Sequence, residues 1–193
     1  MRYFRTFRGQ AFLASLLLLF IGMRMSAQLQ GPMTIQATAM GTSTQLGKIY
    51  NVNIHIEGYS TDDDRQTLIQ AFNKKGRDGL VDALYGMKPK GRVRFASGGV
   101  GNDVKYIFEL PSKNGRMLRL VTDRWVSIGE HRNMTRSTDY AVGIIELHLT
   151  PDGKGTGTLL PACRITMNTK KKQLEVETYQ NPWKLTHFII TKD

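Results

Sequence analysis

The densest run of residues that could do chemistry lies between positions 123 and 140. It combines arginines, whose guanidinium groups can bind a carboxylate or phosphate through paired hydrogen bonds, with aromatic rings that can stack on a ligand. The alternative is that Asp123 and Asp139 pair with these arginines and only hold the segment together. The candidate ligand contacts are Arg124, Trp125, His131, Arg132, Arg136, Asp139 and Tyr140.

The same segment allows a second interpretation, a hydrolase that uses Glu130, His131 and Asp139. Adjacent residues of an extended chain face opposite ways, which disfavours direct cooperation between Glu130 and His131. The sequence also has no Gly-x-Ser-x-Gly motif for a serine nucleophile. We therefore predict a binding protein, with no catalytic residue assigned, and keep the hydrolase as the alternative.

The spacing of the possible ligand residues does not favour a metal or cofactor site. The four histidines form no pair at helical or zinc-finger spacing. Glu146 and His148 lie two residues apart and would share one face of a strand, where a solvated outer face explains them equally well. The glycines of 97–102 precede a strand and not a helix, so they do not form a phosphate-binding loop. We predict no metal and no cofactor.

The N-terminus has the pattern of a secretory signal peptide. Three arginines precede an apolar run at 11–23, and Ser26 and Ala27 supply the small residues of a cleavage site after Ala27. The run is shorter than the about 20 residues that span a bilayer. We expect a secreted or periplasmic protein with no stable transmembrane span after cleavage of residues 1–27.

The charge of the chain points to anionic partners. Its 193 residues carry a net charge of +11, and loss of the four arginines of the signal peptide, which contains no acid, leaves +7. Basic residues cluster at 88–94 and 170–172. Such clusters attract polyanions, although ordinary solvation of a turn and a strand face also explains them. An exported protein seldom meets nucleic acid, so we expect a small ligand or an anionic envelope component and no nucleic acid.

A single cysteine, Cys163, excludes a disulfide within one chain. It lies in an apolar stretch with no histidine near it in sequence, and we expect it to be buried and unreactive.

The elements that position these residues begin with a strand. Residues 28–46 lack steady periodicity and are predicted to be a loosely ordered leader. From Lys48 to Glu57 apolar and polar residues alternate, as in a half-buried strand, which turns His55 away from the core. The single domain is therefore predicted to span 47–193.

Two helices are predicted after this strand. Ser60 and Thr61 can cap the first, and the three aspartates that follow suit the positive end of its dipole better than a calcium loop. Gly76 can end this helix, and Asp78 can cap a second helix that ends before Pro89.

From Lys90 onward the pattern is that of strands joined by tight turns, such as Asn114-Gly115 and the segment 150–153. We predict an α+β fold, an antiparallel meander of about seven or eight strands that is strongly curved or barrel-like, with the two helices inserted after the first strand. A barrel of this kind can hold an apolar ligand, with Tyr106, Phe108 and Met117 as possible lining residues.

Several short motifs in order resemble a family of exported bacterial proteins without a known activity. The motifs are the capped segment 60–65, Met87-Lys88-Pro89-Lys90-Gly91-Arg92, Thr122-Asp123-Arg124, Arg136-Ser137-Thr138-Asp139-Tyr140 and Asp152-Gly153-Lys154-Gly155. The resemblance covers roughly 48–178 and implies bacterial export, with no catalytic residues.

Together these observations predict an exported, non-catalytic binding domain for a small apolar or anionic ligand, or an envelope component. A purely structural envelope protein is a further alternative.

Overall fold

The computed structural model describes residues 31–96, 100–110, 112–128, 140–168, 173–178 and 181–192. The chain divides into two compact units, Met1–Gly31 and Pro32–Asp193, and the fold below is that of the second unit. The predicted signal peptide lies outside the described residues. No helix within the described ranges is long and apolar enough to cross a membrane.

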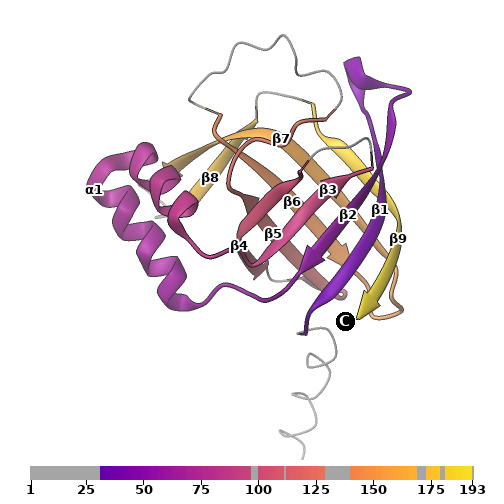
Figure 1. Ribbon diagram of the computed structural model, residues 1–193, viewed down its shortest axis with the longest axis horizontal. Coiled ribbons are helices and arrows are strands. Elements are labelled where there is room, and N and C mark those ends of the chain that lie inside the picture. Colours follow the sequence, from indigo (N-terminus) through magenta and orange to yellow (C-terminus); the bar gives the residue numbers. More distant parts are fainter. Residues whose placement is uncertain are drawn as a thin grey trace, which may run out of the picture. The chain divides into compact units, whose positions relative to one another are not determined.

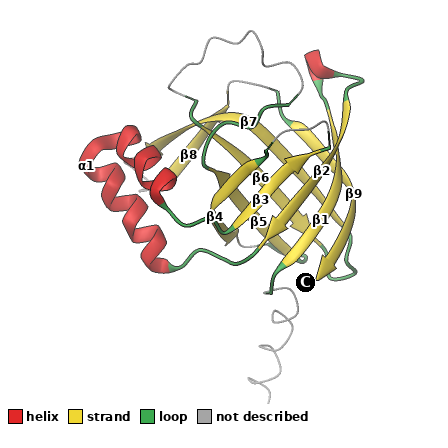
Figure 2. Ribbon diagram, in the orientation of Figure 1, coloured by secondary structure: helices red, strands yellow, loops and turns green. Residues whose placement is uncertain are grey.

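Strands dominate the described part of the second unit, which has a single α-helix (Figure 2). The elements are β1 (Met33–Met40), the short 3-10 helix η2 (Ser43–Gln45), β2 (Ile49–Ile56), α1 (Asp62–Gly86), β3 (Gly91–Phe95), β4 (Asn102–Leu110), β5 (Arg116–Thr122), β6 (Val142–Leu149), β7 (Gly155–Asn168), β8 (Gln173–Thr178) and β9 (Trp183–Lys192).

The strands form one antiparallel sheet that closes into an eight-stranded barrel (Figure 1). Strands β1 to β7 pair in sequence order as a meander, and β9 completes the ring between β7 and β1. Strand β8 pairs with the C-terminal half of β7. The predicted barrel-like α+β architecture is therefore confirmed.

Alternating residues of the strands fill the interior of the barrel. Side chains with no accessible area touch no space large enough for a water molecule, and many inward residues are of this kind. Those at 0% exposure are Ile35, Ala39, Ile54, Ile56, Val93, Val104, Ile107, Leu118, Leu120, Ile145, Leu147 and Leu159.

Helix α1 covers the outer face of the sheet between β4 and β8. Leu68, Leu80 and Leu84 pack against outward residues of β5, β6 and β7, which include Val121 and Ile144. Tyr106 also packs in this outer cluster, so it does not line the barrel interior. The helix begins where predicted: Thr61 is its N-cap and forms a capping box with Asp64.

Two details of the prediction are wrong. The predicted pair of helices forms the single element α1, although its backbone is non-helical at Lys75 and Gly76, where the first helix was expected to end. The segment 28–46 is not a loose leader in its described part, because β1 pairs with β2 on one side and β9 on the other. The two-helix insertion is thus replaced by a single kinked helix that follows the second strand.

Candidate functional site

The segment that follows β5 contains the first of the predicted ligand contacts. Arg124, Trp125 and Tyr140 lie within the described residues. His131, Arg132, Arg136 and Asp139 lie outside them, as does Glu130 of the hydrolase alternative. The geometry below therefore concerns the Arg124 end of the predicted site.

Residues 123–128 are held against the barrel through both apolar and polar contacts. Val126 is fully buried, and its N–H donates to the carbonyl of Pro161 in β7 at 2.8 Å. The Thr122 hydroxyl donates to the Arg124 carbonyl at 2.7 Å and accepts from the Gly143 N–H of β6 at 2.8 Å. The segment is thereby fixed to two neighbouring strands, and Arg124 leaves it at a defined position.

Asn102, the first residue of β4, strengthens this attachment. Its side-chain amide donates to the carbonyls of Arg124 at 3.3 Å and Trp125 at 3.1 Å, and the residue is buried. Buried amides of this kind are retained where they satisfy backbone groups that have left the sheet. The backbone on both sides of the Arg124 side chain is thus bonded to the barrel.

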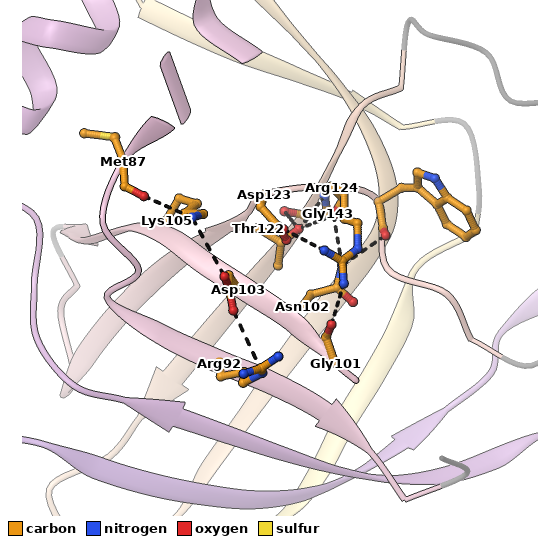
Figure 3. A network of polar contacts seen from close by, with 11 residues as sticks. Met87, Arg92, Gly101, Asn102, Asp103, Lys105, Thr122, Asp123, Arg124 and Gly143 are labelled. Atoms are coloured by element: carbon orange, nitrogen blue, oxygen red, sulfur yellow. Dashed lines mark hydrogen bonds and ion pairs between the residues drawn. The ribbon is translucent and has the colours of Figure 1, made fainter. Parts of the chain in front are cut away.

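The guanidinium of Arg124 is fixed at two points (Figure 3). Nη1 donates to Oδ2 of Asp123 at 2.8 Å, and Nη2 donates to the carbonyl of Gly101 at 2.7 Å. Gly101 has a φ of +80°, and a Cβ there would lie 2.5 Å from the Val93 carbonyl, so this position requires glycine. The Arg124 side chain nevertheless remains 53% exposed.

Asp123 is the buried member of this pair. Its side chain is only 6% exposed, and its N–H donates to the Asp103 carbonyl at 2.9 Å. The second carboxylate oxygen, Oδ1, is buried and has no hydrogen-bond partner within the part of the chain that the structure describes. An unpaired buried acceptor has a large desolvation cost, and such an atom is expected to serve a ligand or a bound water.

A second, looser group of charges lies beside Asp123. The Asp103 carboxylate lies 3.9 Å from Nε of Arg92 and 3.8 Å from Nζ of Lys105. Both distances exceed the 2.7–2.9 Å typical of hydrogen-bonded ion pairs. Lys105 instead donates to the Met87 carbonyl at 3.0 Å, which ties the C-terminal end of α1 to β4 (Figure 3).

We call Arg92, Asp103, Lys105, Asp123 and Arg124 the Asp123 site. Sequence reasoning found Arg124 and noted Asp123, but it treated Arg92 only as part of a basic cluster and missed Asp103 and Lys105. Asp103 and Lys105 lie outside the resemblance motifs, and they join 87–92 to 122–124 only through the pairing of β4 with β3 and β5. In this site Arg92 and Lys105 lie near the Asp103 carboxylate, and Arg124 pairs with the Asp123 carboxylate.

The other side chains considered for chemistry, Glu146 and Cys163, have structural roles. Glu146 accepts hydrogen bonds from Arg119 on the neighbouring strand, which supports the solvated-face interpretation of Glu146 and His148. Among the described residues no group of three His, Cys, Asp or Glu side chains could hold a metal ion. Cys163 is buried, and desolvation raises its pKa to about 12, as expected for an unreactive thiol.

Comparisons with protein-family models, with curated proteins and with solved structures return no match for this chain. Its geometry is therefore the basis for the functional assignment.

Proposed function

We propose that the protein is an exported, non-catalytic binding domain whose Asp123 site recognises a small anionic ligand that carries hydroxyl groups. The proposal keeps the anionic ligand of the sequence-based prediction and gives up the apolar one. The apolar ligand was expected inside the barrel, but many inward side chains touch no water-sized space.

The observation that carries the proposal is the state of Arg124, which is fixed and half exposed at once. A guanidinium has five N–H donors, and the contacts with Asp123 and Gly101 use one donor each of Nη1 and Nη2. An arginine that is already held in place loses little further conformational entropy when it binds a carboxylate. Arg124 is therefore suited to bind an anion.

The charges around Arg124 support a ligand with both acid and hydroxyl groups. Three cations face two carboxylates in the Asp123 site, so the cluster retains a positive charge that attracts an anion. The Asp103 carboxylate is partly exposed and its two cations lie beyond hydrogen-bond distance, so it can accept a hydrogen bond from a ligand hydroxyl. Sugar acids combine these groups, and they occur in the polyanions of cell envelopes.

Export to the periplasm or the medium belongs to the same proposal. It is supported by the pattern of arginines, apolar run and small residues before Gln28 and by the resemblance to exported bacterial proteins. A charged ligand site on the outer surface suits a protein that meets envelope polyanions after cleavage of the signal.

The test is calorimetric titration of the exported protein with D-galacturonate, with neutral D-galactose as the reference sugar. We expect binding of galacturonate only, and an about ten-fold loss of affinity in Arg124→Gln because one charge-assisted contact is removed. Lys154→Gln is the matched control, since Lys154 is 85% exposed on a turn outside the site.

Equal affinity for the two sugars, no binding of either, or an equal effect of both variants would contradict the proposal. Turnover of a galacturonate polymer that is lost in His131→Ala would establish the hydrolase alternative instead.

A further inference from the structure

We infer that the outer face of β1, β2 and β3 is a binding surface for an anionic polysaccharide. This inference extends the proposed function from a small anion to a polymer, and it shares with that function the class of ligand and the side chain of Arg92. We call the surface the outer polar face. Its residues are Thr34, Gln36, Thr38, Asn51, Asn53, His55, Arg92 and Arg94.

The register of the strands places these side chains in rows across the sheet. Thr34 of β1 is opposite His55 of β2, which is opposite Arg92 of β3. In the next row Gln36 is opposite Asn53, which is opposite Arg94. Thr38 and Asn51 begin a third row. Because side chains alternate along a strand, all of these residues point away from the buried Ile35, Ile54 and Val93.

The helix does not cover this face. Helix α1 packs on β4 to β8, and Figure 1 shows it on the side of the barrel away from β1 and β2. Gln36, Asn51, Asn53 and Arg94 are exposed, and the remaining side chains of the face are partly buried. The Thr34 hydroxyl and Nδ1 of His55 lie 3.0 Å apart, so the first row is connected by a hydrogen bond.

The outer polar face consists of polar and cationic side chains, and two carboxylates border it: Asp103 lies 3.9 Å from Nε of Arg92, and Glu57 lies 4.0 Å from Nε2 of His55. Its rows contain hydroxyls, amides, one imidazole and two guanidiniums, and none of its members is a carboxylate. Amides and hydroxyls can each donate and accept, as sugar hydroxyls do, and guanidiniums bind carboxylate or sulfate groups. The exposed guanidinium of Arg94 supplies the positive charge on this face, and it favours an anionic over a neutral sugar polymer.

The extended rows of side chains favour a polymer over a small molecule. Neighbouring strands lie about 4.8 Å apart, and side chains on one face recur about every 6.7 Å along a strand. Exposed hydrogen bonds contribute little one at a time, so a ligand on such a face needs many contacts in a row. A linear polysaccharide supplies acid and hydroxyl groups repeatedly along its length.

Nucleic acid fits the same face less well. Proteins that bind single strands stack the bases on aromatic side chains. None of the eight members of the outer polar face is Phe, Tyr or Trp. Tyr50 of β2 and Phe95 of β3 lie on the inward side of their strands, because they alternate in step with the buried Val52 and Val93. The face thus offers charge and hydrogen bonds without a stacking platform.

The test measures binding of the exported protein to immobilised polygalacturonate by biolayer interferometry, with dextran as the neutral polymer and poly(dT) as the nucleic acid. Two variants alter the face: Arg94→Gln removes a guanidinium, and Asn53→Asp introduces a carboxylate. Lys74→Gln and Asn73→Asp repeat the same chemical changes at exposed positions of α1. Thermal unfolding of all four variants shows whether they fold as the parent does.

We expect salt-sensitive binding to polygalacturonate, no binding to dextran, and an about ten-fold loss in each face variant against less than about two-fold in each control. Equal losses in face and control variants would show attraction by net charge alone and would overturn the inference. Absence of polygalacturonate binding, or tighter binding of poly(dT), would overturn it as well.

The two proposals fail separately. If galacturonate does not bind and Arg124→Gln has no effect, while Arg94→Gln and Asn53→Asp still weaken polymer binding, only the function of the Asp123 site is wrong. If galacturonate binds at the Asp123 site but the face variants bind the polymer as the parent does, only the outer polar face is wrong.

Discussion

Asp123 and Arg124 are neighbours in the chain, yet Asp123 is buried and Arg124 is half exposed, and Nη1 of Arg124 donates to Oδ2 of Asp123 at 2.8 Å. The arrangement places the carboxylate beneath the guanidinium and leaves Oδ1 without a partner within the described chain. The pair is therefore more than a surface ion pair. The buried Asp123 carboxylate orients the exposed guanidinium of Arg124.

We predict that Asp123→Asn weakens galacturonate binding about ten-fold, because the neutral amide no longer holds Arg124 by a charge-assisted hydrogen bond. The free energy of unfolding should fall by only about 1 kcal/mol, since half of the Arg124 side chain is in water. Calorimetry and urea unfolding measure the two effects. Asp152→Asn, in an exposed turn, is the control for which binding should stay unchanged.

Gly143→Ala should destabilise the protein by about 1–3 kcal/mol, as overpacking of a tight contact does. A Cβ at this position would lie 2.5 Å from Cγ2 of Val126 and 2.9 Å from Oγ1 of Thr122, so residues 123–128 would have to move away from β6. Urea unfolding measures the loss. Gly58→Ala is the control, because a Cβ there meets no atom within 4 Å. Equal stability of the two variants would show that the 123–128 segment is not fixed as described.

The Cys163 thiol should not react with a disulfide reagent in the folded protein at pH 8. Burial raises its pKa to about 12, so very little of the reactive thiolate exists, and the side chain is also inaccessible. In denaturant the thiol should react fully within minutes. Rapid reaction of the native protein would contradict the burial of Cys163 beneath α1.

The capping box of α1 should make stability depend on acid pH. The hydrogen bond from the Thr61 N–H and then the Lys90 ammonium, which is 3.0 Å away, lower the pKa of Asp64 against the opposing effect of burial. The folded state therefore favours the ionised carboxylate. Its contribution is complete above the unfolded pKa of about 3.9 and is lost as the pH falls through the lower folded pKa.

Asp64→Asn should remove this part of the pH dependence and lower the free energy of unfolding at pH 7 by about 1 kcal/mol. Asp62→Asn, in the same turn, is the control. Urea unfolding between pH 2 and pH 7 compares the variants. A parallel pH profile for Asp64→Asn and the parent protein would rule out the proposed role of the capping box.

The sequence predicts elements well where one local pattern decides them. The alternation of Val52, Ile54 and Ile56 with polar residues indicates β2, and Thr61 with Asp64 marks the start of α1. Strand β1 was missed because small residues such as Ala37 and Ala39 give weak alternation, and only pairing with β2 and β9 fixes the segment as a strand. Gly76 has a positive φ and interrupts the helix where the sequence predicts an end, and the helical backbone resumes in the stretch that packs Leu80 and Leu84 against the barrel.

The Asp123 site could be predicted only in part, because its residues come from β3, β4 and the segment after β5. Arg92 and Asp103 are eleven positions apart in the chain and become neighbours only through the register of β3 with β4. Asp123 lies beside Asp103 because its N–H continues the bonding of β5 to β4. Local patterns do not contain this information.

The central claim is that the protein binds an anionic sugar on its charged outer surface and not within the barrel. The most direct measurement is an NMR titration of the isotopically labelled exported protein with oligogalacturonate, which reports every backbone amide at once. We predict chemical-shift changes of the backbone amides of Gly101, Asp103 and Arg124 at the Asp123 site, and of Asn53 and Arg94 on the outer polar face. Changes confined to interior positions such as Ile107 and Leu159, or no changes at saturating ligand, would contradict the claim.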